Sequence, residues 1–305
     1  FPPKRGNVAH ITIPPRKVAR KPISADEGRG SRRGRTVASR GRGSHTPYST
    51  CISREEQTVT EWVQATVVEY IRWTDALVSL RFEAELEPFN AGQFIRVGMD
   101  IDGERIGRPY SLVNAPHERP HEIHFNIVPD GPLSPRLAQL QPGDTFWVVP
   151  NPNGFLTLDE VPEARHLWLL ATGTGIGPFL SILKTAAPWS RFEKIVLGHS
   201  VHTLNELSYQ ETIHDLLESH PAQFQFVPFI TREPCEDHLC QRIPASIESG
   251  ALEQKTGLTL TPELSHVLLC GNSGMLQDAL VMLEKRGMQR HRRSEPGHVS
   301  MEKYH

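Results

Sequence analysis

Four consecutive residues in the first half of the chain, Arg108-Pro109-Tyr110-Ser111, combine the groups that a flat, phosphorylated ligand would use. A guanidinium binds phosphate through two parallel hydrogen bonds, and Tyr110 and Ser111 add a flat ring and a hydroxyl. The four residues stand at the end of an expected strand, where Arg108 and Tyr110 share one side because alternate side chains point the same way. A planar, phosphorylated cofactor would use all three groups. A sheet with a surface arginine and a core tyrosine would show the same pattern.

A second group in the same half is the run Gly-Pro-Leu-Ser-Pro-Arg-Leu at residues 131–137. This run can turn into a short helix whose first amide groups, together with Ser134, face an anion. Alone it indicates less than the Arg108 to Ser111 group.

In the second half, residues 172–178 read Thr-Gly-Thr-Gly-Ile-Gly-Pro between an expected buried strand and an expected helix. Strand, glycine-rich loop and helix is the arrangement in which backbone amides and a helix N-terminus meet a pyrophosphate. The glycines lie at i, i+2 and i+4, so the loop is neither the GxGxxG fingerprint nor a Walker loop.

Two later strand ends also carry polar residues, Thr231-Arg232 and Cys270-Gly271-Asn272. Ligands of open α/β sheets bind outside the carboxyl ends of the strands. Arg232 and Arg242 could together clamp the 2′-phosphate that distinguishes NADP from NAD. Two ordinary exposed arginines remain the alternative interpretation.

The elements that must position these residues differ between the halves. Short alternating runs and turn signals in the first half predict six strands and an antiparallel barrel. The second half alternates strands with helices, which predicts an open, five-stranded, mostly parallel sheet. The expected strands of the first half are residues 62–71, 76–84, 93–101, 106–113, 122–128 and 145–149. In the second half, strands alternate with helices. The expected strands are residues 167–171, 195–199, 224–231 and 266–270, and the expected helices are one that ends at residue 183, one near 204–217, one near 243–248 and one at 275–285.

Charge separates the start of the chain from the rest. Residues 1–50 hold twelve Lys and Arg against two acidic residues, whereas the remaining residues hold 21 against 33. Residues 1–57 are rich in Arg, Gly and Pro and poor in aromatic residues, so they cannot offset their ordering entropy, and disorder is expected. A solvated tail or translated upstream sequence, a transit peptide and an RNA-associating segment stay open as interpretations.

Four scattered cysteines without a CxxC pair indicate neither a disulfide framework nor the usual zinc spacings, so a reducing compartment is the default and no metal site is expected. The longest charge-free apolar run, residues 167–183, contains three Gly and a Pro and is a poor membrane span.

Taken in order, RPYS, LSPRL, LLATGTGIGP, TRE with the later Arg242, and LLCGN resemble the bacterial ferredoxin/flavodoxin–NADP reductase family. The similarity runs from about Trp62 to the C-terminus and includes stretches without motif function, such as WTDALVSL and RIPASIESGALE. The resemblance implies an FAD-binding antiparallel β-barrel followed by a five-stranded parallel α/β NADP-binding domain. We expect a tail over residues 1–57, the barrel over 58–160 and the α/β domain over 161–305.

The family pattern also implies site residues. Arg108 would hold the flavin pyrophosphate, Tyr110 would stack on the flavin, and Ser111 would hydrogen-bond near N5. Cys270 would lie beside the nicotinamide C4. Cys270 and Ser111 together would hold the geometry of hydride transfer. The other residues at FAD-contact positions are Pro109, His124, Pro132, Leu133, Ser134, Thr174, Tyr304 and His305. The residues at NADP positions are Gly173, His202, Thr231, Arg232, Arg242 and Asp278, of which Thr231, Arg232 and Arg242 would bind the 2′-phosphate.

His124 stands where the family commonly has a Tyr that contacts the flavin. Three departures from the family pattern stand out. The segment before Glu61 has no counterpart in the compact family members. His202 replaces an Arg, which weakens NADP preference or makes it depend on pH. The chain ends Tyr304-His305 where close relatives end Tyr-Trp, and imidazole is a smaller stacking surface.

The resemblance predicts a ferredoxin (flavodoxin)–NADP reductase, an oxidoreductase that couples reversible FAD-mediated hydride transfer with NADPH to one-electron exchange with ferredoxin or flavodoxin. The alternatives are another FAD-dependent NAD(P)H reductase serving an oxygenase or free acceptor and, disfavoured, a nucleic-acid-binding protein acting through its Arg/Gly tail. We expect a cytoplasmic monomer that binds neither nucleic acid nor membrane.

Overall fold

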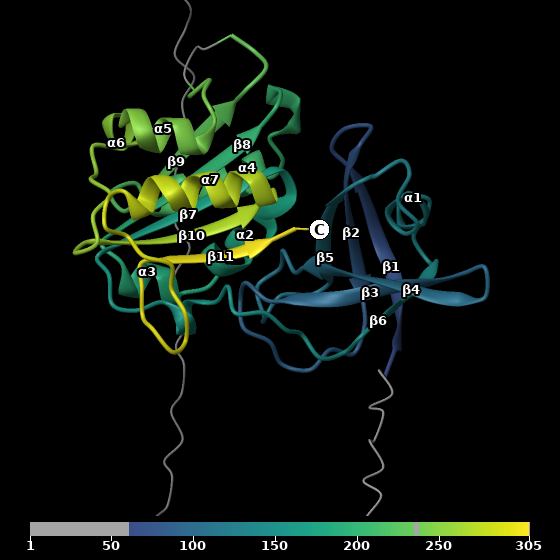
Figure 1. The fold of residues 1–305 in the computed structure, drawn as a ribbon. Helices are drawn as coiled ribbons and strands as arrows, with labels where there is room; N and C mark the ends of the chain where they lie inside the picture. Colours follow the sequence, from purple (N-terminus) through teal and green to yellow (C-terminus); the bar gives the residue numbers. More distant parts are fainter. Residues whose placement is uncertain (1–60, 235–237, 305) are drawn as a thin grey trace, which may run out of the picture. The chain divides into compact units, whose positions relative to one another are not determined.

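The computed structural model describes residues 61–234 and 238–304 (Figure 1). The predictions made for residues 1–57 and for His305 lie outside these residues. No helix in the described part is long and apolar enough to cross a membrane.

The first sheet has six strands in the order β4-β3-β6-β1-β2-β5, all paired antiparallel (Figure 1). Their bounds are β1 Val63–Arg72, β2 Leu77–Glu83, β3 Phe94–Ile101, β4 Glu104–Ser111, β5 His121–Asn126 and β6 Thr145–Val148. A bridge between Leu112 and Ile123 links the two ends of this order, so the sheet curls into the predicted barrel. Alternate residues Val78, Leu80 and Phe82 fill its core, as their spacing predicts.

The second sheet has five parallel strands in the order β11-β10-β7-β8-β9. The strands are β7 His166–Thr172, β8 Lys194–Val201, β9 Phe224–Ile230, β10 Ser265–Gly271 and β11 Val299–Lys303. The central strands β7, β8 and β10 are almost entirely buried because helices cover both faces. Leu167 and Leu169 face one helical layer, and Trp168 and Leu170 face the other.

The helices divide between these two faces. One layer holds α2 Gly177–Leu183, α3 Ala187–Arg191 and α4 Gln210–Ser219; the other holds α5 Ile243–Ser249, α6 Ala251–Thr256 and α7 Ser273–Glu284. Short 3-10 turns lie at Leu158–Glu160, Gly173–Ile176 and Leu204–Glu206, and α1 (Ser134–Leu137) follows the barrel strand β5. This arrangement confirms the two-part fold class predicted from the sequence.

Some elements differ from expectation. The helix expected over 204–217 begins only at Gln210, because Tyr209 adopts a left-handed conformation with φ of 60°. The sequence pattern indicated neither α3 nor α6, which are five and six residues long. It also gave no range for β11, a strand of five residues. The domain division at residue 160 falls between β6 and β7 and stays a prediction.

Candidate active site

A cavity of about 840 Å³ opens at the carboxyl ends of β7, β8, β9 and β10, where ligands of such sheets bind. Barrel residues Leu77 and Asn126 form part of its wall, so both sheets contribute to one cavity. The α/β residues that line it include Gly173, Thr174, His202, Thr231, Arg242, Asn272, Asp278 and Tyr304.

The glycine-rich loop forms the 3-10 turn Gly173–Ile176 before α2, as the strand, loop and helix pattern predicts. Gly173 has φ of 52°, and a Cβ placed there would make one ordinary contact, with the side-chain amide nitrogen of Asn126 3.8 Å away. His199 Nε2 donates a hydrogen bond to the Gly173 carbonyl oxygen over 2.9 Å. Burial lowers the pKa of His199 to about 4, so a neutral imidazole holds this loop in place at physiological pH.

The loop after β10 lies against the end of β7. The amide of Asn272 donates to Thr172 Oγ1 over 2.9 Å, and the Asn272 side chain accepts hydrogen bonds from the first amides of α7. A Cβ on Gly271, whose φ is 131°, would lie 2.1 Å from Thr172 Oγ1. Only glycine fits this approach, so the two loops form one continuous wall of the cavity.

Both predicted catalytic residues, Ser111 and Cys270, interact with Tyr304. The Tyr304 hydroxyl donates to Ser111 Oγ over 3.0 Å, and its backbone amide donates to the Gly271 carbonyl. Cys270 and Tyr304 are close enough to perturb each other's pKa. Burial raises the pKa of the Cys270 thiol well above its ordinary value, so the thiol keeps its proton at neutral pH. The structure therefore brings Ser111 of the barrel to the end of β10.

Arg108 and Pro109 are exposed on β4, next to Tyr110. The Arg108 guanidinium makes one hydrogen bond within the described residues, to the Gly107 carbonyl, which leaves its other N–H groups available to a phosphate. The Tyr110 ring packs edge-on against Phe125 with centroids 5.5 Å apart, and burial raises its pKa to about 12. Tyr110 therefore stays neutral and presents a fixed aromatic ring.

Among the phosphate-contact candidates, Leu133 and Ser134 are buried and Pro132 is exposed. Ser134 Oγ accepts a hydrogen bond from the Val128 amide over 2.9 Å. Because a hydroxyl can donate and accept at once, Ser134 keeps its own proton for a ligand.

The predicted NADP residues are not equivalent in the structure. Gly173, His202, Thr231, Arg242 and Asp278 line the cavity, but Arg232 does not. Arg242 is exposed there and has no carboxylate partner within the described residues.

The sequence interpretation missed Glu206, which lines the same wall. Its carboxylate accepts a hydrogen bond from the His202 amide over 3.2 Å, and its other oxygen accepts one from Thr203 Oγ1 over 3.0 Å. An acidic residue four positions after His202 was the available signal.

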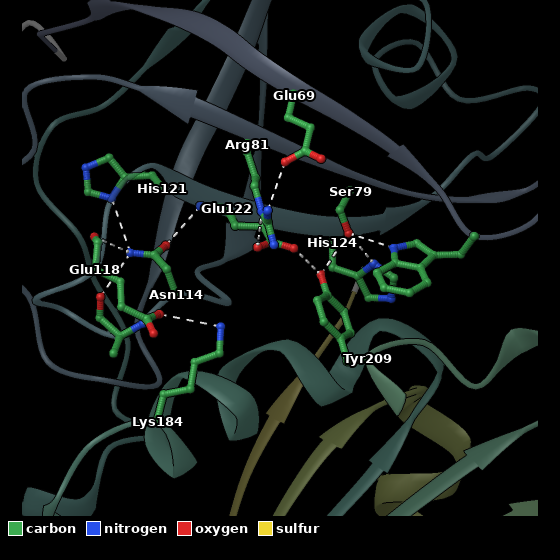
Figure 2. Close-up of polar contacts among 12 residues, drawn as sticks. Glu69, Ser79, Arg81, Asn114, Glu118, His121, Glu122, His124, Lys184 and Tyr209 are labelled. Carbon is green, nitrogen blue, oxygen red and sulfur yellow. Dashed lines mark hydrogen bonds and ion pairs between the residues drawn. The ribbon is translucent and has the colours of Figure 1, made fainter. Parts of the chain in front are cut away.

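Within the described residues, no hydrogen bond or ring contact joins His124 to Tyr110 or Ser111. His124 faces Ser79 and Tyr209, with its ring 5.1 Å from the Tyr209 ring (Figure 2). Both of its ring nitrogens are engaged, Nδ1 with Ser79 Oγ at 2.9 Å and Nε2 with Ser208 Oγ at 3.1 Å. A hydrogen bond from His124 to a flavin would therefore require one of these contacts to break.

The sequence matches two known domain families, the oxidoreductase FAD-binding domain over residues 66–156 and the oxidoreductase NAD-binding domain over residues 169–280. It is 46% identical over 218 residues to the flavodoxin/ferredoxin–NADP reductase of Escherichia coli strain K12, covering 72% of this chain and 88% of that protein. The chain belongs to the flavodoxin/ferredoxin–NADP reductase family. The ferredoxin–NADP reductase of Pseudomonas aeruginosa is 33% identical, with 78% of this chain and 95% of that one covered.

Among solved structures, the ferredoxin NADP+ reductase of Neisseria gonorrhoeae with bound FAD and NADP superposes with a TM-score of 0.75 at 34% identity. The match covers 79% of this chain and 98% of that one. The two sheets described above are thus the FAD and NADP domains of this reductase family.

Both cofactors suit the residues present. The free N–H groups of Arg108 beside the Tyr110 ring suit a phosphate joined to a flat ring system. The loop at Gly173, which lines the cavity, and the unpaired guanidinium of Arg242 suit a second phosphorylated nucleotide there. FAD and NADP(H) are the cofactors of this reductase.

Proposed function

We propose that this chain is a ferredoxin/flavodoxin–NADP reductase in which the Arg108 to Ser111 segment holds FAD and the 840 Å³ cavity holds NADPH. The observation that carries this assignment is the Tyr304 to Ser111 hydrogen bond of 3.0 Å. It joins the end of β4, where FAD would bind, to a residue that also lines the 840 Å³ cavity. Two ligands bound at these places would meet at Ser111, Cys270 and Tyr304.

FAD, when bound, exchanges a hydride with a nicotinamide and single electrons with a carrier protein. The chain's own residues bind and orient the two ligands. Arg108 binds phosphate by charge-assisted hydrogen bonds, Tyr110 fixes the plane of the ring that it contacts, and Ser111 offers a hydroxyl beside that ring.

On the nucleotide side, the His199 hydrogen bond fixes the carbonyl of Gly173, so the loop amides are held for the ligand. The Cys270 thiol keeps its proton and is fully buried behind the cavity lining, and the Cys270 backbone carbonyl lies against Gly175. We assign no proton transfer to any of these groups, because hydride exchange needs close approach and orientation rather than an acid.

The remaining NADP residues divide by position. Arg242 and Thr231 line the cavity and would bind the 2′-phosphate, while Asp278 lines the wall formed by α7. His202 lies beside Glu206, with 3.7 Å between Nδ1 and Oε2, so part of any positive charge on His202 would be neutralised before a phosphate arrives. We therefore propose a weaker preference for NADPH over NADH than an arginine at position 202 would give.

Absorbance spectroscopy tests the function directly. Purified protein should carry noncovalent FAD, and anaerobic titration with NADPH should bleach the flavin bands. Turnover with purified ferredoxin or flavodoxin should exceed turnover with free flavin. A colourless protein that does not oxidise NADPH would refute the proposal, and turnover with free flavin alone would favour a reductase of another acceptor.

We further propose that the chain works as a cytoplasmic monomer without nucleic acid, which rests on the family resemblance alone. Size-exclusion chromatography with light scattering tests the monomer, because a dimer would elute at twice the chain mass of 34.3 kDa.

A further inference from the structure

A buried polar network connects the barrel to the segment between β8 and α4 (Figure 2). Tyr209 contributes its hydroxyl, which lies 2.6 Å from Glu122 Oε1 and 2.7 Å from Ser79 Oγ. Ser208, the preceding residue, lies 3.1 Å from His124 Nε2. We call Ser79, Glu122, His124, Ser208 and Tyr209 the latch.

The contacts of the latch allow one arrangement of protons. The Tyr209 hydroxyl donates to the Glu122 carboxylate, which only accepts and also takes a hydrogen bond from Arg81 Nε over 3.0 Å. Ser79 must then donate to the Tyr209 oxygen, because the single Tyr209 proton is already used. Ser79 Oγ therefore accepts from His124 Nδ1, as it does from Trp73 Nε1 over 2.9 Å.

The rest of the arrangement follows from this one. With its proton on Nδ1, His124 accepts from Ser208 Oγ at Nε2. Burial lowers the pKa of His124 to about 3, and burial together with Glu122 raises the pKa of Tyr209 well above its usual range. Both groups therefore keep these protonation states throughout the physiological pH range.

The latch lies out of reach of water. Ser79 is fully buried, and the other four members are between 1% and 5% exposed. A partner removed here is not replaced by solvent, so the group that it leaves behind stays unsatisfied. Each hydrogen bond from Ser208 or Tyr209 to the barrel thus favours one fixed placement of these two residues against the barrel.

Tyr209 also has an unusual backbone. It has φ of 60°, a conformation that a bulky side chain rarely adopts. Asp102, the other described non-glycine residue with positive φ, stands in an Asp-Gly turn, where this conformation is common. The strain at Tyr209 persists because its hydroxyl and ring are held, the ring lying 4.7 Å from that of Trp73.

The latch adjoins the nucleotide cavity on both sides. Leu77 and Asn126, two residues from Ser79 and His124 along their strands, form the barrel wall of the cavity. On the other side, residues 202, 203, 205 and 206 line it just before Ser208 and Tyr209. The hydrogen bonds of the latch therefore fix the distance between these two walls of the cavity.

We propose that Tyr209 and its latch partners are positioning residues that fix the β8 to α4 segment against the barrel and so preform the NADPH cavity. This inference rests on the proposed function for the identity of the ligand, but not for the existence of the latch. Other contacts also join the barrel to the α/β part, since Ser181 Oγ of α2 donates to the Asn114 carbonyl over 2.7 Å and Lys184 pairs with Glu118 at 3.4 Å. Opening the latch should therefore loosen one wall of the cavity without separating the domains.

The test is Tyr209→Phe, which removes one hydroxyl and keeps the ring. Tyr70→Phe is the matched control, because Tyr70 is a half-buried tyrosine on β1 with no hydrogen bond from its hydroxyl among the described residues. If the latch opens part of the time, the apparent affinity for NADPH equals the intrinsic affinity multiplied by the fraction of molecules in which the latch is closed. We expect KM for NADPH to rise about tenfold with ferricyanide as acceptor, while kcat and bound FAD stay within about twofold.

A second measurement needs no cofactor turnover. Amide hydrogen exchange of peptides covering residues 202–210 should be about tenfold faster in Tyr209→Phe than in the wild type, and unchanged in Tyr70→Phe. A variant that merely lost stability would melt at a lower temperature without changing KM for NADPH.

The proposal is overturned if either KM or exchange in Tyr209→Phe matches the Tyr70→Phe control. Should Tyr209→Phe not fold, Ser208→Ala is judged by the same two criteria, because it removes only the donor to His124 Nε2. A wild-type protein that neither holds FAD nor oxidises NADPH would refute the proposed function instead, and hydrogen exchange alone would then decide the latch.

Discussion

Gly175 lies in the 3-10 turn of the glycine-rich loop, where it contacts the backbone of the neighbouring strand. A Cβ at this position would lie 2.5 Å from the Cys270 carbonyl oxygen, 2.7 Å from its carbon and 3.0 Å from the Gly271 nitrogen. All three atoms belong to the backbone at the end of β10, so no side chain can rotate away. Gly175→Ala must therefore move the loop or the strand end.

The size of the effect follows from these distances. Ordinary contacts of a carbon atom begin near 3.4 Å, whereas a Cβ on residue 175 would lie 2.5 Å from the Cys270 carbonyl oxygen. The loop or the end of β10 must therefore shift by nearly 1 Å. Overpacking of this kind costs about 1–3 kcal/mol. For a protein of this size, that loss lowers Tm by roughly 2–12 °C. A displacement of about 1 Å at a ligand-positioning loop can also lower turnover about a hundredfold.

Calorimetry and NADPH-dependent ferricyanide reduction measure the two effects, and flavin absorbance reports whether FAD stays bound. Gly177→Ala is the matched control, because a Cβ there would meet Val113 Cγ2 at 3.4 Å, an ordinary contact in a helical position. We expect Gly177→Ala to keep Tm and turnover close to the wild type. Equal losses in the two variants would refute the argument, because they would show that the close approach to Cys270 has no special consequence.

We make four further predictions. Arg108→Ala should lose most bound FAD, seen as a fall in the ratio of flavin to protein absorbance; full occupancy with normal turnover would contradict the assignment. Arg242→Ala should raise KM for NADPH about ten- to hundredfold and change KM for NADH little, as expected for a charge-assisted hydrogen bond, whereas Arg232→Ala should have the smaller effect. Burial raises the pKa of Glu302 from 4.5 to about 7, so between these two pH values the folded protein binds a proton that the unfolded chain has lost, and the stability of the wild type falls as pH rises. The Tm of Glu302→Gln should therefore rise relative to that of the wild type between pH 5 and 8. A difference in Tm that stays constant over this range would contradict the argument. A chain lacking residues 1–57 should keep its flavin and its NADPH oxidation, and loss of both would show that our division of the chain is wrong.

Local patterns in the sequence predicted much of the fold. The alternation of Val78, Leu80 and Phe82 predicted one buried face of β2, and those side chains fill the barrel core. The apolar run that became β7 predicted a buried parallel strand. Such elements depend on the period of the chain itself and on no distant partner. Elements of five or six residues, such as α3 and β11, repeat too few times to leave a readable period.

The candidate site was predictable in part for the same reason. The Arg108 to Ser111 group and the loop from Gly173 to Gly177 are contiguous, so the strand or turn that holds them also sets their side chains in order. Family similarity added residues far apart in the chain, but it did not distinguish Arg242, which lines the cavity, from Arg232, which does not. That difference depends on where the loop after β9 runs in space.

By itself, therefore, the sequence determined the two kinds of sheet, their order and the short motifs at the strand ends, because these depend on neighbours within a few residues. Only the tertiary structure decided that Tyr304 meets Ser111 across 193 residues and that Tyr209 meets Glu122 across 87. It also placed His124 within the latch, with both ring nitrogens engaged. Such contacts depend on how two separately patterned sheets pack, and side-chain spacing along one strand carries no record of the partner that packing brings to it.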